Sequence, residues 1–317
     1  MKKEALGTIL AIIAALISGV SIMANKLFIV DMEPVVFTAV RALFIGIIFF
    51  MLLSYSSWGR NKVVKKNKAK DRAKVKANAP KKIPWKYYLA IGIIGGAFAF
   101  LLFFSGLKLT TGGRAAFLQK TMPLYITVLA LVFLKEKISR KQLGAMLLMF
   151  LGMIAIYYAT ISPAELWANP SMGDLMVIGA AFLWAVEAII AKRVMVKGES
   201  NLMVSFARMF IGAIVLFAFL AAFGNAESLN LTAQQITNLS ISTALLFGYV
   251  FFWYYSMKLI NVSKASALLL IAPVISMALG VMFLSEPVAA LQLIGSAMIL
   301  IGSYIVIKIR SELATGV

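Results

Sequence analysis

The sequence contains no cysteine and no histidine. Their absence excludes disulfides, thiol nucleophiles, Cys/His metal sites and histidine proton relays. Acidic residues are also scarce, with 12 Asp and Glu against 31 Lys and Arg. No HExxH motif, P-loop or serine–histidine pair is present. We therefore expect a protein that is not an enzyme and that holds no metal and no cofactor.

Hydrophobic residues, in contrast, make up 62% of the 317 residues, and charged residues only 14%. The apolar residues run together in stretches of about 20, the length of a helix that crosses a hydrocarbon core. This pattern predicts an all-α membrane protein with ten transmembrane helices. We place them near residues 5–25, 34–55, 87–107, 113–134, 140–160, 173–195, 201–223, 239–260, 264–284 and 288–308.

The distribution of Lys and Arg predicts the orientation of these helices. With the N-terminus inside, 25 of the 31 basic residues fall on the inner side, and the outer segments 161–172, 224–237 and 285–287 carry none. Basic residues concentrate on the cytoplasmic side of membrane proteins. We therefore expect a multi-pass protein of the cytoplasmic (plasma) membrane with both termini in the cytoplasm.

One segment, residues 57–86, holds twelve Lys or Arg and one acid, Asp71, which is a net +11 of the formal +19. We interpret it as a cytoplasmic loop that fixes topology. A polybasic loop can also bind anionic lipid headgroups. Nucleic acid is not an expected partner, because no aromatic residues are interleaved with these charges before Trp85.

The two halves of the sequence resemble each other. Residues 108–157 and 258–307 are identical at 12 of 50 positions at an offset of 150, among them Pro123/Pro273 and Glu136/Glu286. The start of each half matches at an offset of 166, as in Gly7/Gly173. Because each half holds five spans, the second half enters the membrane upside down. We therefore predict two inverted repeats, residues 1–160 and 161–317, the first of which contains the basic loop.

Several motifs resemble the EamA family of the drug/metabolite transporter superfamily. They are the run from Ser263 through Pro273 and Leu284-Ser-Glu286-Pro287 to Gln292 and Gly302, and the run Gly173-Asp to Lys192 with Trp184. The first half repeats the pattern with Pro123, Glu136 and Gln142. This resemblance implies ten spans around a central cavity lined by spans 1, 3, 4, 6, 8 and 9, with spans 5 and 10 at the periphery. It implies transport of small molecules but names no substrate.

Two charged residues at mid-membrane depth, Glu187 and Lys120, depart from the general pattern of that family. A charge at mid-bilayer costs at least about 2.5–3.5 kcal/mol on insertion scales, so each needs a reason. Glu187 could bind a substrate ammonium or a coupling proton, or be a structural partner of Lys120 or an Arg. Lys120 could bind a substrate carboxylate.

Polar and aromatic side chains at helical spacing accompany these two charges. Trp184 and Glu187 share a face of span six, and their repeat mates on span one are Ser18 and Ser21. We predict that one central cavity is bordered by these residues and their neighbours. The predicted substrate-binding or coupling residues are Glu187, Lys120, Ser21, Asn25, Ser18, Trp184, Phe117, Tyr249 and Trp253.

Other intramembrane residues receive structural interpretations. Arg41 and Arg208 lie near span ends, where snorkelling and packing explain them. Pro123 and Pro273 should kink spans four and nine. Glu136 and Glu286 lie at short helix junctions, where we expect each to cap the next helix.

Three functions remain open. The leading one is a secondary transporter that moves a small organic metabolite, with amino-acid-like cargo favoured, by alternating access. The second is efflux of lipophilic cationic drugs, which requires Lys120 to face away from the cavity. The third is a non-transporting scaffold or lipid-binding protein that acts through the basic loop. A homodimer is also open.

Overall fold

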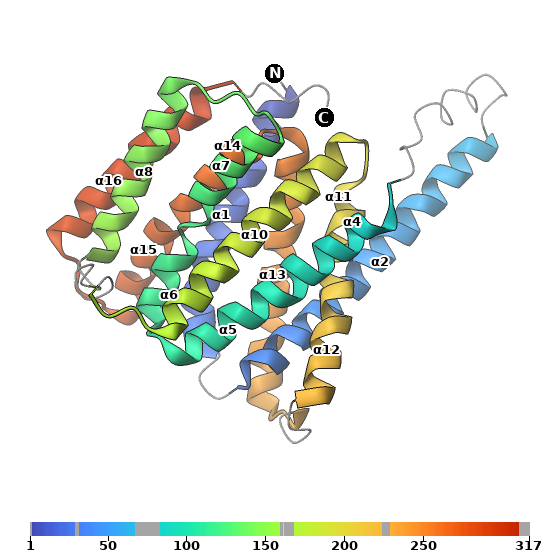
Figure 1. The fold of residues 1–317 in the computed structure, drawn as a ribbon, viewed down its shortest axis with the longest axis horizontal. Coiled ribbons are helices and arrows are strands. Elements are labelled where there is room, and N and C mark those ends of the chain that lie inside the picture. The colour runs from blue at the N-terminus through green and yellow to red at the C-terminus, as the bar shows by residue number, and fades with distance from the viewer. Residues whose placement is uncertain are drawn as a thin grey trace.

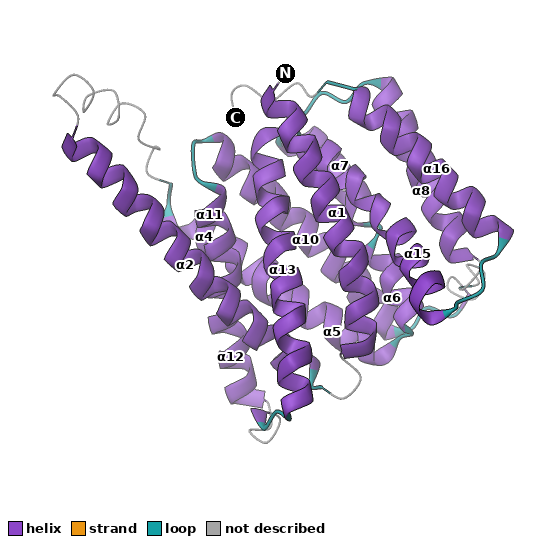
Figure 2. Ribbon diagram, turned by 180° about the vertical axis from the view of Figure 1, so that it is seen from behind, coloured by secondary structure: helices purple, strands orange, loops and turns teal. Residues whose placement is uncertain are grey.

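The computed structural model describes residues 2–28, 32–66, 83–158, 161, 168–223 and 229–310. Within these residues the protein is helical and contains no strand (Figures 1 and 2). Ten helical stretches are long and apolar enough to cross a membrane, judged by length and composition, and they confirm the predicted number.

Six of these stretches are single helices and four are composite. The single helices are α1 (Lys2–Phe28), α2 (Pro34–Lys66), α8 (Arg140–Tyr158), α10 (Met172–Val196), α13 (Ala233–Leu259) and α16 (Ala290–Lys308). The composite spans are α4 (Trp85–Ala90) with η1 (Ile91–Phe98) and α5 (Ala99–Leu109); α6 (Gly112–Gln119) with α7 (Met122–Phe133); α11 (Asn201–Phe206) with η2 (Ala207–Ile211) and α12 (Gly212–Phe223); and α14 (Val262–Leu268) with η4 (Leu269–Ile271) and α15 (Ala272–Leu284).

The predicted loop 57–86 begins later than expected. Helix α2 continues through its first basic residues and ends at Lys66. The next helix begins at Trp85. A run of Lys with Val63 and Val64 does not oppose helix formation, since Lys and Arg are good helix formers. The part of the predicted loop at 67–82 lies outside the described residues.

Spans four and nine are interrupted just before their prolines. In span four, α6 ends at Gln119 and α7 begins at Met122, one residue before Pro123. In span nine a 3₁₀ segment precedes Ala272, which is followed by Pro273. Proline donates no backbone N–H, so a break costs least on its N-terminal side. The interruption of span four positions Lys120.

The two composite spans also end in the same turn. Lys135 and Ser285, which are repeat mates, have φ of 51° and 52°. The backbone N–H of Glu136 donates to Ala130 O at 3.2 Å, and that of Glu286 donates to Gly280 O at 3.3 Å. Each helix therefore ends in a left-handed residue followed by a bond back to the last turn.

Helices α8 and α16 pack against each other at one side of the molecule (Figure 1). The central helices pack as α1 with α13 and as α10 with α5. Helix α1 begins and α16 ends at one end of the bundle, where Lys264 Nζ donates to Ile309 O at 2.5 Å and to Glu4 Oε1 at 3.3 Å. We call this the basic end.

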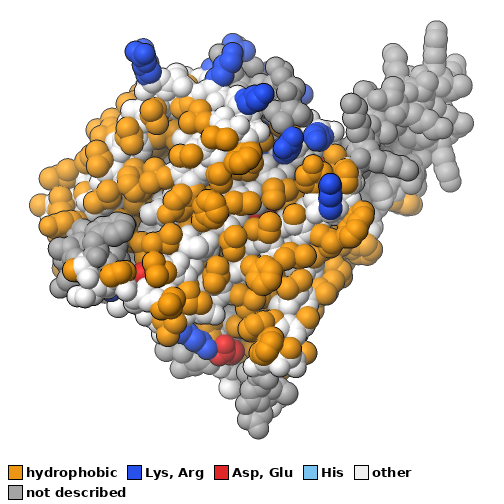
Figure 3. All heavy atoms as spheres, in the orientation of Figure 1, with side chains coloured by type: hydrophobic (Ala, Val, Ile, Leu, Met, Phe, Trp, Pro, Cys, Tyr) orange, Lys and Arg blue, Asp and Glu red, His pale blue; other side chains and the backbone are white. Residues whose placement is uncertain are grey.

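The surface matches a membrane environment. Large apolar side chains are exposed along the sides of the bundle, including Phe50 at 57% and Met282 at 73%. Figure 3 shows hydrophobic side chains over most of the visible face and Lys and Arg gathered mainly toward the basic end. An apolar surface of this extent is unfavourable in water and favourable in contact with lipid.

Candidate functional site

A cavity of about 590 Å³ lies between the central helices. All six spans that the family resemblance implies contribute to its lining. Of the nine predicted site residues, eight line it: Ser18, Ser21, Asn25, Lys120, Trp184, Glu187, Tyr249 and Trp253. Phe117 does not line it and instead packs edge-on against Tyr157, with 5.6 Å between ring centroids. Pro123 lies at the cavity wall, whereas Pro273 is not part of the lining.

Glu187 is held in a buried network on the wall formed by α10. Its carboxylate accepts a hydrogen bond from Tyr254 Oη at 2.6 Å and forms an ion pair with Arg208 Nη1 at 3.5 Å. Arg208 Nη1 also donates to Tyr254 Oη at 3.1 Å. The three side chains are 0–6% exposed. The sequence offered Lys120 or an arginine as the structural partner of Glu187. The structure shows that the partner is Arg208 and not Lys120.

Glycines on span three make room for this network. A Cβ added to Gly95 would lie 2.2 Å from Glu187 Cγ. One added to Gly96 would lie 1.9 Å from Arg208 O. The two π-helical segments η1 and η2 pack against each other here. Any larger residue at Gly95 or Gly96 would push span three away from the charged pair.

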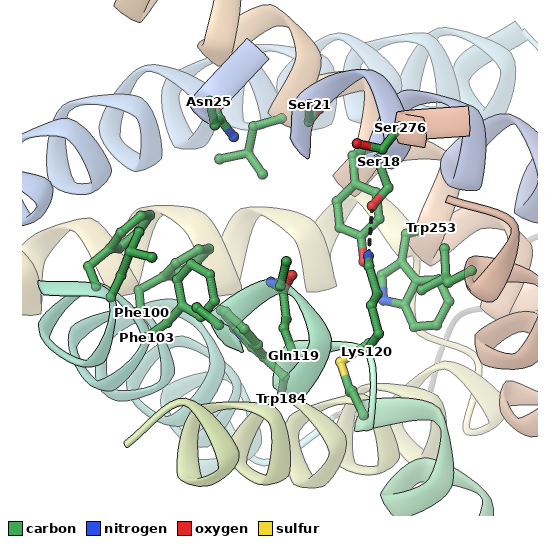
Figure 4. A pocket seen from close by; sticks show the side chains of 18 of the residues that line it. Ser18, Ser21, Asn25, Phe100, Phe103, Gln119, Lys120, Trp184, Trp253 and Ser276 are labelled. Carbon is green, nitrogen blue, oxygen red and sulfur yellow. Dashed lines mark hydrogen bonds between the residues drawn. The ribbon is translucent and has the colours of Figure 1, made fainter. Parts of the chain in front are cut away.

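Lys120 lies at the break between α6 and α7 and lines the same cavity. It is 7% exposed, and its Nζ donates to Ser18 Oγ at 3.3 Å (Figure 4). Trp253 lies beside it in the same view. No carboxylate pairs with Lys120 among the described residues.

The sequence interpretation of Arg41 combines snorkelling with helix packing, and the snorkelling part is wrong. The side chain of Arg41 is 2% exposed and lines the cavity. Nε donates to Phe37 O at 3.0 Å, and Nη1 donates to Ser242 Oγ at 2.8 Å. Ser242 in turn donates to Asn25 Oδ1 at 2.7 Å. The preceding turn of α2 and the neighbouring α13 supply polar partners, so the guanidinium has no need to reach the membrane surface.

The same interpretation was given to Arg208, and its ion pair with Glu187 on a neighbouring helix corrects the snorkelling part. The sequence did contain a signal for both arginines, because Arg41 and Arg208 occupy equivalent positions in the two halves. Tyr254 was missed because the tyrosine has no feature that separates it from the other span aromatics. The sequence analysis also missed the close packing at the glycines of span three. The cluster of Gly92, Gly95 and Gly96 within one span was a signal for it.

Aromatic rings form much of the remaining wall. Trp184 packs against Phe100 and Phe103 with centroid separations of 5.2 and 5.4 Å, and its Nε1 donates to Gly95 O at 3.1 Å. Tyr249 stacks on Trp253 at 6.4 Å. Apart from its few charged and hydroxyl groups, the lining therefore suits an apolar or aromatic body.

At the basic end the two halves contact each other through Glu136. Glu136 is 3% exposed, and its carboxylate accepts hydrogen bonds from Val262 N at 2.8 Å, Ser263 N at 3.2 Å and Ser263 Oγ at 2.6 Å. The sequence predicted that Glu136 caps the next helix, α8. That prediction is wrong, because Glu136 caps α14. The first turn of α8 is capped by Ser139, whose Oγ accepts from Gln142 N at 3.1 Å.

Lys192 makes a further buried contact at this end, within the second half (161–317). Its Nζ donates to Met257 O at 2.6 Å and to Ile260 O at 2.8 Å, and its side chain is 2% exposed. At the opposite end the cavity lining reaches Gly112 and Gly113, which are exposed at the start of α6. Glu286, the repeat mate of Glu136, is also exposed.

A model of the EamA-like transporter family matches residues 5–158 and 171–308. The chain belongs to this family. Its members are transporters and not enzymes, in agreement with the sequence prediction.

Relatives of this transporter are found in bacteria and archaea. It is 24% identical over 290 residues to the uncharacterized transporter YoaV of Bacillus subtilis, covering 91% of this chain and 92% of that protein. It is 24% identical over 236 residues to a "Probable amino-acid metabolite efflux pump" of Salmonella typhimurium, covering 71% and 77%. A solved crystal structure with 17% identity has a TM-score of 0.72 over 95% of this chain and 97% of the other, which shows a shared fold.

Proposed function

We propose that this EamA-family protein is a secondary transporter that moves a small organic metabolite across the membrane by alternating access. The observation that carries this proposal is the cavity of about 590 Å³ with buried charged groups. A cavity of that volume is within the usual range of small-molecule sites. Charges inside a membrane protein mark substrate or ion pathways far more often than packing.

The packing of the helices supports the division into inverted repeats 1–160 and 161–317. Span one packs on span eight (α1 with α13), and its mate, span six, packs on span three (α10 with α5). Spans five and ten, which are mates, pack on each other (α8 with α16). The family match also falls in two stretches, one in each half. Two halves that face each other around one cavity can rock to expose it alternately to either side.

The basic end is the cytoplasmic end in this proposal. Both termini of this plasma-membrane protein then lie in the cytoplasm. Figure 3 shows Lys and Arg gathered mainly toward the basic end. The exposed cations include Lys135, Lys137, Arg140, Lys141 and Lys197. The positive-inside rule gives this orientation. The cavity then reaches toward the outer side through Gly112 and Gly113, and the buried contacts of Glu136 and Lys192 lie on its cytoplasmic side.

Two observations bear on the cargo. The Salmonella typhimurium relative is named for amino-acid metabolites, which is compatible with the amino-acid-like cargo predicted from the sequence. Efflux of lipophilic cations required Lys120 to face away from the cavity, and Lys120 faces into it. The geometry therefore does not favour the cationic-drug alternative.

The test is a metabolite screen with the purified full chain in proteoliposomes, with and without a pH gradient. We expect uptake or counterflow of at least one small metabolite above that of protein-free vesicles. If the imposed gradient drives accumulation, a proton is the coupling ion. If no compound exchanges under either condition, the proposed function is wrong.

Deletion of residues 60–82 separates a transporter from a lipid-binding scaffold. A transporter should keep its activity without this segment, because the described lining of the cavity comes from other parts of the chain. A scaffold that acts through the segment should lose binding to vesicles containing anionic lipid. The oligomeric state of the detergent-purified protein, measured in the same preparations, tests the homodimer that the sequence left open.

A further inference from the structure

The cavity has an excess of positive charge. Among the residues that the structure describes, its lining contains three cations, Arg41, Lys120 and Arg208, and one carboxylate, Glu187. Glu187 is occupied by Arg208 and Tyr254. The pair leaves Arg41 and Lys120 without a counter-ion among the described residues.

Lys120 is the cavity cation with the fewest polar partners among the described residues. An ammonium has three donors, and the described structure gives it one acceptor, Ser18 Oγ, at 3.3 Å. Ser18 is itself on the cavity wall formed by α1, so a ligand that approaches Ser18 also approaches Lys120 (Figure 4). The helix break at Lys120 fixes the position of its side chain without a salt bridge.

Arg41 extends the positive field along α1. It uses Nε and Nη1 for Phe37 O and Ser242 Oγ, and it is linked through Ser242 to Asn25. Asn25 lies two helical turns from Ser18, roughly 10 Å along the axis. Arg41 is also stacked on the Phe37 ring, with 3.8 Å between Cζ and the centroid. These contacts orient the guanidinium but leave its charge uncompensated.

An uncompensated cation in a low-dielectric site is unfavourable, and an anion that enters the site relieves this cost. An ammonium group on the substrate would add to this unfavourable energy, because Glu187, the carboxylate described in the lining, is already paired with Arg208. The body of the ligand would lie against Trp184, Trp253 and Phe103. These rings suit an apolar or aromatic moiety.

We propose that the cavity recognises the carboxylate of a small organic acid with an apolar body, and that Lys120 and Ser18 bind that carboxylate while an α-amino group on the substrate contributes little. This inference rests on the proposed transport function and narrows its substrate class to organic anions. Amino acids remain within the class through their carboxylate, whereas amines fall outside it.

The test uses compounds that share a hydrocarbon body and differ in their charged groups: 3-phenylpropionate, phenylalanine and 2-phenylethylamine, with 4-methylpentanoate, leucine and 3-methylbutylamine as an aliphatic set. Binding to the detergent-purified full chain is followed by tryptophan fluorescence, because Trp184 and Trp253 line the cavity. We expect the acids to bind, the amino acids to bind comparably, and the amines to bind at least tenfold more weakly.

Variants assign the effect to Lys120. Lys120→Met should weaken acid binding about tenfold or more, and Lys120→Arg should retain most of it. The control is Lys108→Met, which removes the same charge from a side chain that is 53% exposed and outside the cavity lining. Thermal stability of each variant shows that it is folded.

The outcomes separate this inference from the transport proposal. If amines bind and acids do not, or if Lys120→Met binds acids like the unmodified chain, the anion site is wrong while the transporter stands. If none of the acids binds but the proteoliposome screen finds another cargo, the anion site is again overturned. If no compound is bound or exchanged at all, both proposals fail together.

Discussion

At the scale of single residues, the carboxylate of Glu187 is paired with Arg208 and is therefore not an open binding site for a cation. The carboxylate is 1% exposed and fully engaged by Arg208 and Tyr254. It can accept a proton or a substrate cation only by releasing one of these partners. Glu187 therefore suits a switch between paired and protonated states better than a permanently open binding group.

Glu187→Gln tests that role. The substitution keeps the shape and the hydrogen bond to Tyr254 but leaves Arg208 as an uncompensated buried cation. We expect gradient-driven accumulation to be lost, with substrate exchange retained if Glu187 carries the coupling proton. Loss of both activities would instead indicate direct substrate binding. Full activity in this variant would reject every functional role for Glu187.

The partner of Glu187 is tested by double substitution. Breaking a buried pair on one side costs about 3–5 kcal/mol, and removing both charges restores much of it. Glu187→Gln with Arg208→Met should thus recover thermal stability relative to Glu187→Gln alone. Glu187→Gln with Lys120→Met should not, because Lys120 contacts Ser18 and not Glu187. Equal recovery in both double variants would contradict the pairing.

Gly95→Ala tests how closely span three must approach the charged pair. Its added methyl group would lie 2.2 Å from Glu187 Cγ, so we expect a loss of about 1–3 kcal/mol in stability and a fall in transport. The control is Gly144→Ala in α8, where no atom lies within 4 Å of the added Cβ. That control should be neutral or stabilising, because Ala is the better helix former. Similar melting temperatures for the two variants would refute the close-contact explanation.

Much of the site was predictable from helical spacing, and the rest was not. Ser18, Ser21, Trp184 and Glu187 share equivalent faces of α1 and α10, so the stripe alone predicted a common space. Arg41 was misinterpreted because depth along a span does not reveal a polar partner on a neighbouring helix. Only packing placed Ser242 beside it.

At the scale of helices, hydropathy located all ten spans, because the requirement for an apolar segment is local. The end of α2 was predicted too early, since a basic run ends the membrane span but not the helix. The π-helical segments η1 and η2 had no sequence signal that we recognised. They occur where spans three and seven meet at Gly96 and Gly212, a contact between residues distant in the sequence.

The cap of α14 by Glu136 is tested by Glu136→Ala. The variant leaves the backbone N–H groups of Val262 and Ser263 without their acceptor, so we expect a loss of about 1–3 kcal/mol. The repeat mate provides the matched control, since Glu286 is exposed in this conformation. Glu286→Ala should lower the melting temperature less. The reverse order would show that Glu136 does not stabilise this state.

At the scale of the whole molecule, the two ends of the bundle are packed differently although the sequences of the halves correspond. At the basic end α14 packs against α7, while the equivalent pair, α6 and α15, packs far less within the described residues. Glu136 is buried on the backbone of Val262 and Ser263, whose repeat mates at an offset of 150 are Gly112 and Gly113. If the halves exchange conformations, Glu286 takes over the equivalent cap at Gly112 and Gly113 as Glu136 releases α14.

This exchange predicts reciprocal exposure of two positions that the repeat relates. The chain has no cysteine, so Ser263→Cys and Gly113→Cys each introduce a single thiol. Ser263 is fully buried, whereas Gly113 is exposed and an added Cβ there would be 3.6 Å from its nearest neighbour, Ile161. A hydrophilic maleimide should therefore label the thiol at 113 quickly and the thiol at 263 slowly. Adding Glu136→Gln, which weakens the contact between the halves at the basic end, should raise labelling at 263 and lower it at 113. The opposed direction is the decisive feature, because general loosening of the fold would raise both rates, and a rigid bundle would change neither.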